Sequence, residues 1–206
     1  MARPTEADRD RALYVGACRI DLVRRSGTAR LLSDARLATT VARALEAAGA
    51  PVPASVTIVL TDDAELTDLN RAHLERDEPT DVLSFPMLEP EAYPDHPGRV
   101  SMAATAAAAA TAGAAARPVA GAPIPAAGPA GRVHIGDIAI SVERAIDQAE
   151  AGRGGQTGDV RWSPADELRL LVTHGVLHLC GWDHAEPVEE AAMRSLEQRL
   201  LAEGRR

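Results

Sequence analysis

The feature that most constrains this chain is an eleven-residue stretch near its C-terminal end, which contains three of the six histidines. His174 and His178 are four residues apart, so on a helix they project from one face, one turn apart. Gly181 lets the backbone leave that helix, because glycine reaches positive φ without a Cβ penalty, and His184 can then return to the same ion. Three imidazoles without a fourth protein ligand in the segment are typical of an open, catalytic Zn²⁺ site.

The spacing is similar to the metzincin signature H-E-x-x-H-x-x-G-x-x-H, in which the glutamate is the general base of a zinc peptidase. Both later histidines and the glycine are present here, but Gly175 occupies the position of the glutamate. Glycine cannot take a proton from water. The sequence therefore predicts one bound Zn²⁺ per chain without the peptidase base.

Composition restricts the partners. A chain of 206 residues predicts a single domain, 1–206, and its formal net charge of −8 argues against general binding of polyanions, so we expect no DNA partner. Aromatic residues make up 2% of the chain, too few for a row on which single-stranded bases could stack. Arginines gather early in the chain, and this clustering fits a solvated face as well as it fits a binding patch. They are Arg19, Arg24, Arg25, Arg30, Arg36 and Arg43.

The two cysteines, Cys18 and Cys180, have no C-x-x-C spacing and fit a reducing compartment. Cys180 lies two residues after His178, so on a helix it points away from the ion, and we expect a buried apolar side chain rather than a ligand. The charged N-terminus has no signal-peptide pattern, and no apolar run is long enough to span a bilayer. We expect a cytoplasmic protein without a membrane partner.

Hydrophobic periodicity and turn residues predict an alternation of strands and helices. This alternation indicates an α/β fold with a mixed, mostly parallel four-stranded sheet covered by helices. Residues 1–12 are expected to fray. The expected strands are 14–23, 55–60, 82–86 and 134–141, and the expected helices begin near Ser33, Asp62, Val142, Ser163 and Pro187.

A change in composition interrupts this pattern between residues 89 and 131. The part from Ser101 to Ala130 contains 16 alanines mixed with glycine and proline, and it offers no large apolar face to bury. We expect a low-complexity, flexible insertion within the domain.

Several segments together resemble the YbeY family of bacterial endoribonucleases and rRNA maturation factors, from about Ser33 to Leu201 apart from the insertion. The segments are Leu69-Asn70, Asp77-x-Pro79-Thr80-Asp81-Val82-Leu83-Ser84-Phe85-Pro86, Gly136-Asp137-Ile138 and the histidine motif. The resemblance implies an α/β fold with a metzincin-like zinc helix. It implies a zinc-dependent, single-strand-specific endoribonuclease that acts in 3′-end maturation of small-subunit rRNA and in ribosome quality control. The implied partners are ribosomal RNA and the small ribosomal subunit.

The residues beyond the metal ligands are less constrained. Many relatives carry an arginine where this chain has Leu74, and Arg76 is the nearest candidate to replace it. Thr80, Asp81 and Ser84 form either an active-site rim that contacts substrate or an ordinary turn. The same choice applies to Asp183, which can orient a ligand histidine or cap its own turn. The sequence identifies no catalytic side chain, and a zinc-bound water is the expected nucleophile.

Two other functions compete with RNA cleavage. A zinc peptidase would need a base other than Gly175. A non-catalytic ribosome-assembly factor would use zinc only to brace the fold.

Overall fold

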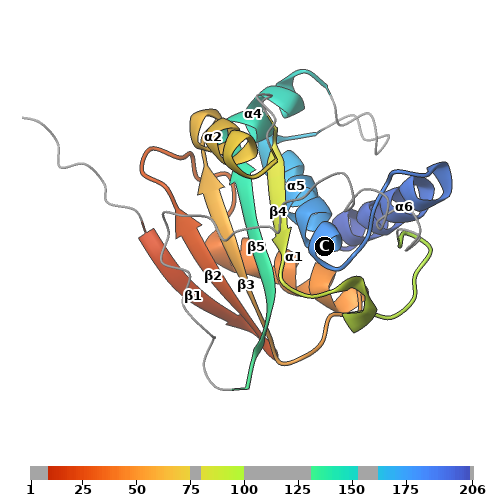
Figure 1. Ribbon diagram of the computed structural model, residues 1–206. Helices are drawn as coiled ribbons and strands as arrows, with labels where there is room; N and C mark the ends of the chain where they lie inside the picture. The colour runs from red at the N-terminus through yellow and green to blue at the C-terminus, as the bar shows by residue number, and fades with distance from the viewer. Residues whose placement is uncertain (1–8, 75–79, 100–130, 153–161, 205–206) are drawn as a thin grey trace, which may run out of the picture.

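A computed structural model describes residues 9–74, 80–99, 131–152 and 162–204. In these residues, five strands form a single sheet with the order β1-β2-β3-β5-β4 (Figure 1). The strands are β1 (Arg9–Val15), β2 (Cys18–Arg24), β3 (Ala54–Thr61), β4 (Val82–Pro86) and β5 (Val133–Ser141). The helices are α1 (Asp34–Ala47), α2 (Asp63–Leu74), α4 (Val142–Glu150), α5 (Pro164–Leu179), α6 (Pro187–Glu203) and the short 3-10 helix η1 (Pro90–Ala92).

The prediction of a four-stranded, mostly parallel sheet is wrong in the number of strands and in the proportion of parallel strand pairs. The pairs β2–β3 and β3–β5 are parallel, whereas β1–β2 and β4–β5 are antiparallel. Residues 14–23 are not one strand, because Gly16, with a φ of 55°, and Ala17 form a tight turn that pairs Val15 with Cys18. The charged residues before that turn form β1 rather than a frayed end, as the pairing of Arg11 with Leu22 shows.

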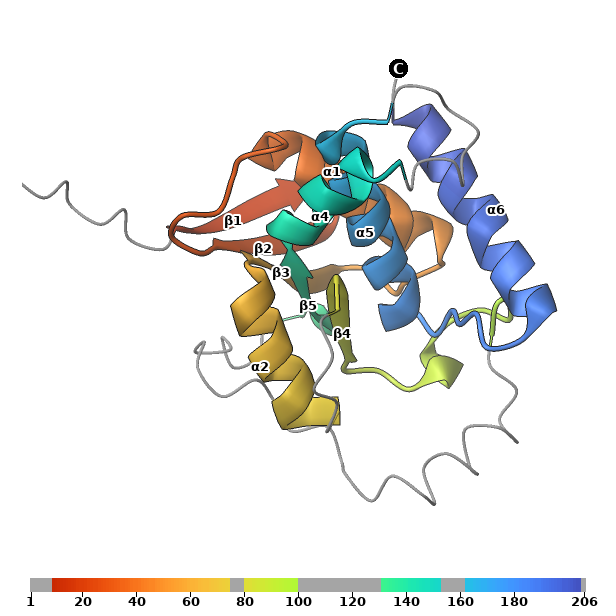
Figure 2. The same cartoon turned by 90° about the horizontal axis from the view of Figure 1, so that it is seen from above.

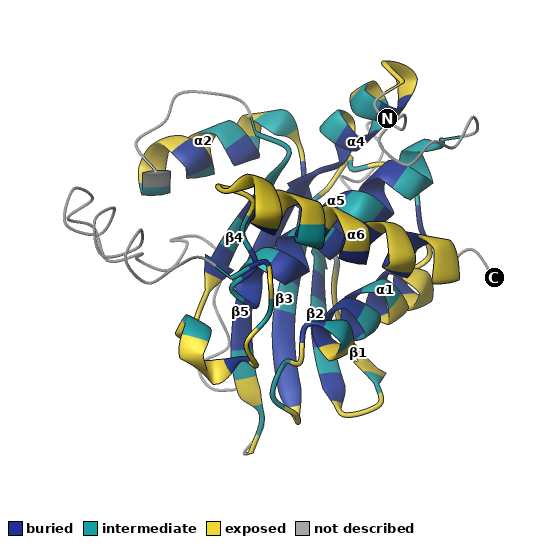
Figure 3. Ribbon diagram, turned by 90° about the vertical axis from the view of Figure 1, so that its right-hand side faces the viewer, coloured by how far each residue is buried: buried dark blue, intermediate teal, exposed yellow. Residues whose placement is uncertain are grey.

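One face of the sheet carries the main core. Alternate strand residues such as Ile20, Ile58 and Ile138 point to this face, and each has 0% of its surface exposed. Helices α1 and α5 pack there, and α6 packs on α5 with an exposed outer surface (Figure 3). The core is mostly aliphatic, with contributions from α1 residues such as Leu37 and Leu45, and it also contains Tyr93 and Trp182.

The opposite face of the sheet is covered only in part. Figure 2 shows α2 on the other side of the strands from α1 and α5. Leu66 of α2 packs there with Leu83, Phe85 and Ala139 in a small second cluster. Among the described residues, no helix combines the length and the apolar character that crossing a membrane requires.

The beginning of the expected insertion is folded. Tyr93 is only 4% exposed, and His96 stacks on Trp182 with ring centroids 4.2 Å apart. The backbone of Gly98 passes so close to the Trp182 ring that a Cβ at residue 98 would lie 2.2 Å from it. Residues 90–99 therefore pack beside the loop that follows α5, while the alanine-rich part, 100–130, lies outside the described residues.

Candidate metal centre

Helix α5 presents the first two histidines. Ser163 caps it in a reciprocal capping box with Asp166, both hydrogen bonds being 3.2 Å long, and Pro164 occupies the first turn. The helix ends at Leu179, and Gly181 with a φ of 80° reverses the chain. The start of α5 at Ser163 and the exit of the chain at Gly181 are predicted from the sequence, whereas the reciprocal hydrogen bond with Asp166 is not.

The loop after α5 is held by backbone hydrogen bonds at both ends. Trp182 N donates to Leu177 O at 3.0 Å, and Asp183 N donates to Gly98 O at 2.6 Å. These bonds return the chain to the end of the helix, so that His184 lies beside His174, with ring centroids 5.4 Å apart.

The three imidazoles converge. His174 Nε2 and His178 Nε2 are 3.0 Å apart, and one ligand nitrogen from each of the three histidines lies within 4.8 Å of the others. A tetrahedral zinc with bonds of 2.0–2.1 Å places neighbouring nitrogens about 3.3 Å apart, so the donor set fits one small divalent cation. Within the described part of the chain, this is the one group of three such side chains that could hold a metal ion.

A carboxylate from α6 orients one of these rings. Glu197 Oε1 lies 2.8 Å from His174 Nδ1, and Glu197 is 8% exposed. A hydrogen bond from Nδ1–H to a carboxylate fixes the ring and leaves the lone pair of Nε2 directed at the metal position. Sequence reasoning missed Glu197, because nothing local separates it from the other glutamates of α6.

Burial keeps His178 in the form that binds metals. Desolvation, together with the neighbouring His174 and His184, lowers the pKa of His178 to about 4. The imidazole is therefore neutral at physiological pH, and no proton has to be displaced from it when a metal binds.

Gly175 has a packing role. A Cβ at residue 175 would lie 2.9 Å from Ile138 Cγ2 and 3.1 Å from Val82 Cγ2, so this position of α5 faces the sheet. Ser84 Oγ donates a hydrogen bond to Gly175 O at 3.1 Å and ties β4 to the helix. A glutamate side chain at residue 175 would start against β4 and β5 rather than beside the metal position.

A cavity of about 340 Å³ opens beside the histidines and is rich in carboxylates. His174 and His184 line it, and Arg194 is its only cationic lining residue among those described, paired with Glu190. The acidic lining favours a bound cation and disfavours a bare phosphate. The carboxylates are those of Asp81, Glu167, Glu190 and Glu197.

The predicted substrate-contact residues separate in the structure. Asp81 lines the cavity, and its Oδ2 accepts a hydrogen bond from Gln148 at 2.9 Å. Thr80 Oγ1 donates to Val82 O at 3.1 Å, and neither Thr80 nor Ser84 lines the cavity. Arg76 lies outside the described residues.

Two residues next to the metal ligands have structural contacts. Asp183 Oδ1 accepts a hydrogen bond from the backbone N of His184 at 2.7 Å, which is the turn-capping alternative. Cys180 is fully buried, and burial raises the pKa of its thiol to about 12. The orienting contact that was considered for Asp183 is made by Glu197.

Comparisons with known proteins show which family the chain resembles. The family model for endoribonuclease YbeY matches residues 25–205. A protein of Symbiobacterium thermophilum named endoribonuclease YbeY is 38% identical, over 78% of this chain and 79% of the relative. A protein of Salinispora tropica with the same name is 39% identical, over 90% of this chain and 96% of the relative. A solution structure from Thermotoga maritima is a more distant match, with a TM-score of 0.47 and 19% identity over 91% of both chains. The chain therefore belongs to the YbeY family of endoribonucleases.

Proposed function

We propose that this protein is a zinc-dependent endoribonuclease that cleaves single-stranded RNA. The observation that carries the proposal is the convergence of His174, His178 and His184 on one point at the edge of an open cavity, in a chain of an endoribonuclease family. The three histidines would hold the ion, and three protein ligands would leave it accessible to solvent or substrate.

The residues of the chain would bind the metal, orient its histidine ligands and accept protons. When bound, zinc supplies a water of pKa near 7 and polarises a phosphoryl oxygen. Glu197 holds the His174 ring, and Asp81 and Glu167 place carboxylates in the same cavity, where they can accept a proton. The acidic lining would repel RNA phosphates unless a cation neutralised it, which makes metal dependence a requirement of the electrostatics.

Gly175 argues against peptidase activity on steric grounds as well as chemical ones. The backbone at residue 175 faces Ile138 and Val82, so the position that supplies the base in a metzincin is taken up by packing on the sheet. A metal held by the three histidines would supply the nucleophile for RNA hydrolysis, so no strong protein base would be needed at this position.

We further propose the 3′ end of small-subunit rRNA as the substrate, and rRNA maturation and ribosome quality control on the small subunit as the setting. The support is the family assignment, since proteins named endoribonuclease YbeY match this chain over most of their length. That setting is the cytoplasm, and the two free, buried cysteines are compatible with it.

A paired assay tests the proposal. Zinc-loaded protein is incubated with labelled single-stranded RNA and with casein, with and without a chelator, next to a His178→Ala variant. We expect RNA cleavage that the chelator and the variant both abolish, with casein intact. Cleavage of casein but not RNA would favour the peptidase. A His178→Ala variant that lost zinc and cleavage yet supported normal rRNA processing in cells would favour the assembly factor.

A further inference from the structure

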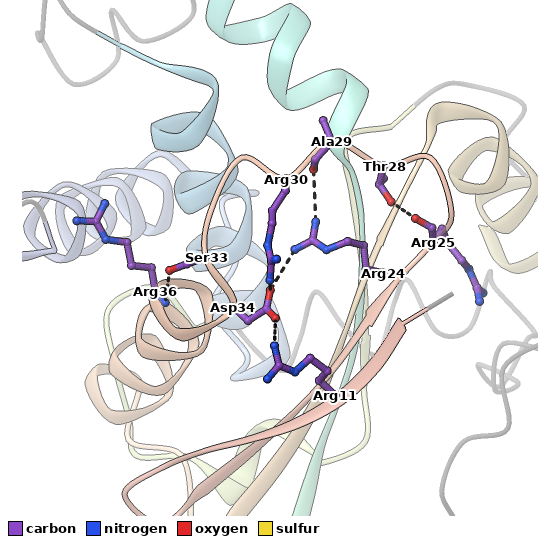
Figure 4. Close-up of polar contacts among 9 residues, drawn as sticks. All are labelled: Arg11, Arg24, Arg25, Thr28, Ala29, Arg30, Ser33, Asp34 and Arg36. Carbon is purple, nitrogen blue, oxygen red and sulfur yellow. Dashed lines mark hydrogen bonds and ion pairs between the residues drawn. The ribbon is translucent and has the colours of Figure 1, made fainter. Parts of the chain in front are cut away.

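Three arginines share one carboxylate at the start of α1. Asp34 Oδ2 accepts a hydrogen bond from Arg11 Nη1 at 2.8 Å, and Asp34 Oδ1 accepts one from Arg30 Nη2 at 2.6 Å. Arg24 Nη2 lies 3.5 Å from the same Oδ1. Figure 4 shows the three guanidiniums converging on Asp34 from β1, from the end of β2 and from the loop before α1. We call Arg11, Arg24, Arg30 and Asp34 the arginine cluster.

The cluster carries a surplus of positive charge. Three guanidiniums face one carboxylate, and every acidic contact that the described residues offer to these arginines is to Asp34. Arg24 Nη2 is buried and has no hydrogen-bond partner among the described residues. Mutual repulsion among the three cations is therefore only partly offset, and a second anion would relieve it.

The surplus charge is accessible to solvent. The side chains of Arg11 and Arg30 are 60% and 54% exposed, whereas those of Arg24 and Asp34 are 13% and 8% exposed. Arg11 and Arg30 bind the two oxygens of one carboxylate, so their guanidiniums lie close enough to contact one phosphate together. The buried Arg24 adds a fixed positive charge beneath them, and the N-terminus of α1 adds a positive partial charge beside them.

We propose that the arginine cluster binds a backbone phosphate of the RNA substrate at a point separate from the metal centre. The inference rests on the proposed function for the identity of its ligand. Arginine forks match phosphate geometry, and a chain with a net charge of −8 needs a local cationic patch to hold RNA. None of the cluster's residues lines the cavity beside the histidines.

Removing the two exposed arginines tests the inference. The Arg11→Ala/Arg30→Ala variant is compared with an Arg71→Ala/Arg199→Ala control, which removes the same charge from α2 and α6. Binding of a fluorescent single-stranded RNA to the full chain is measured by anisotropy in chelator, so that the RNA stays intact, over a range of salt concentrations.

We expect the cluster variant to bind at least about tenfold more weakly than the control at low salt. Losing one neutralised phosphate on single-stranded RNA lowers the magnitude of the slope of log K against log salt by about 0.7. In cleavage assays with zinc, KM rises while kcat is unchanged. Equal affinities and equal slopes for the two double variants would overturn the inference.

The opposite charge change gives a second test, which remains available if the double variant does not fold. Asp34→Asn keeps all three arginines and raises the surplus charge, so RNA binding becomes tighter and its salt slope steeper. A folded Asp34→Asn protein that binds RNA no more tightly than the wild type would contradict a binding role.

Chelator-sensitive RNA cleavage by the wild type is measured in parallel. If that cleavage is absent, the proposed function fails. If it is present but the cluster variants behave as the control, only this inference fails.

Discussion

The contact between Glu197 and His174 makes the candidate metal centre depend on α6 as well as on α5. Replacing Glu197 by alanine removes the acceptor for His174 Nδ1–H, so the ring is no longer fixed and its basicity falls. We expect zinc affinity to fall by about 10- to 100-fold, measured by competition with a chromogenic chelator.

Glu190→Ala is the matched control for that experiment. Glu190 lines the same cavity, but its carboxylate contacts Arg194 rather than a histidine. Equal zinc affinities for the Glu197 and Glu190 variants would show that the contact does not support metal binding.

Gly175 offers a test in which the sign of the effect is informative. Alanine in place of glycine inside a helix normally stabilises a protein by about 1 kcal/mol. At residue 175 the new methyl group would lie 2.9 Å from Ile138 Cγ2, and overpacking of this kind costs about 1–3 kcal/mol. We therefore expect Gly175→Ala to lower the free energy of unfolding, measured in urea. An increase would mean that α5 has room to move away from the sheet.

Ion pairing around Asp34 ties several elements together, because its partners come from β1, β2 and the loop before α1. Burial alone would raise the pKa of Asp34, but the hydrogen bonds from Arg30 and Arg11 and the charges of Arg30 and Arg24 outweigh it, and the pKa is lowered. A carboxyl group with a lowered folded-state pKa contributes stability that is present above its unfolded-state pKa. That stability is lost as the pH falls through the folded-state value.

Asp34→Asn should accordingly be less stable than the wild type at pH 7, by about 1–3 kcal/mol. The difference should shrink as the pH falls below about 4, because protonation of Asp34 removes the same charge in the wild type. Chemical unfolding of both proteins between pH 7 and pH 3 checks this. A difference that did not depend on pH would mean that the asparagine acts through packing instead.

The elements that were predictable from sequence are those whose causes are local. The cap at Ser163, the spacing of His174 and His178, and the turn at Gly181 all act within a few residues, so α5 and its loop follow from the sequence. Strand β1 was missed because its charged residues resemble a free terminus, although as an edge strand β1 tolerates them.

The features that the sequence does not predict depend on contacts between elements that are far apart in the chain. Glu197 reaches His174 only because α6 packs on α5, and the antiparallel pairing of β4 with β5 is decided by tertiary contacts. The sequence also shows that arginines gather early in the chain. It does not show that Arg11, Arg24 and Arg30 share one carboxylate, since Asp34 joins them across three separate segments.

For the molecule as a whole, the proposed metal binding would be linked to stability, because the three imidazoles meet only in the folded chain. A ligand that binds the native state alone stabilises it by about 2.7 kcal/mol at a concentration of 100 times its Kd. We expect zinc to raise the Tm of the wild type by several degrees and to leave the Tm of His178→Ala nearly unchanged. Differential scanning calorimetry with and without a chelator checks this, and equal shifts for both proteins would place the stabilising zinc elsewhere.

The burial of Cys180 beside three candidate histidine ligands should make the site resistant to oxidants. Peroxide attacks thiolates, and a buried thiol with a pKa near 12 presents almost none at neutral pH. Imidazole does not undergo the stepwise oxidation that cysteine sulfur does. A zinc site with only histidine ligands therefore has no thiolate whose oxidation would release the ion. A zinc ion held by these three histidines would therefore stay bound under conditions that release zinc from cysteine-ligated sites.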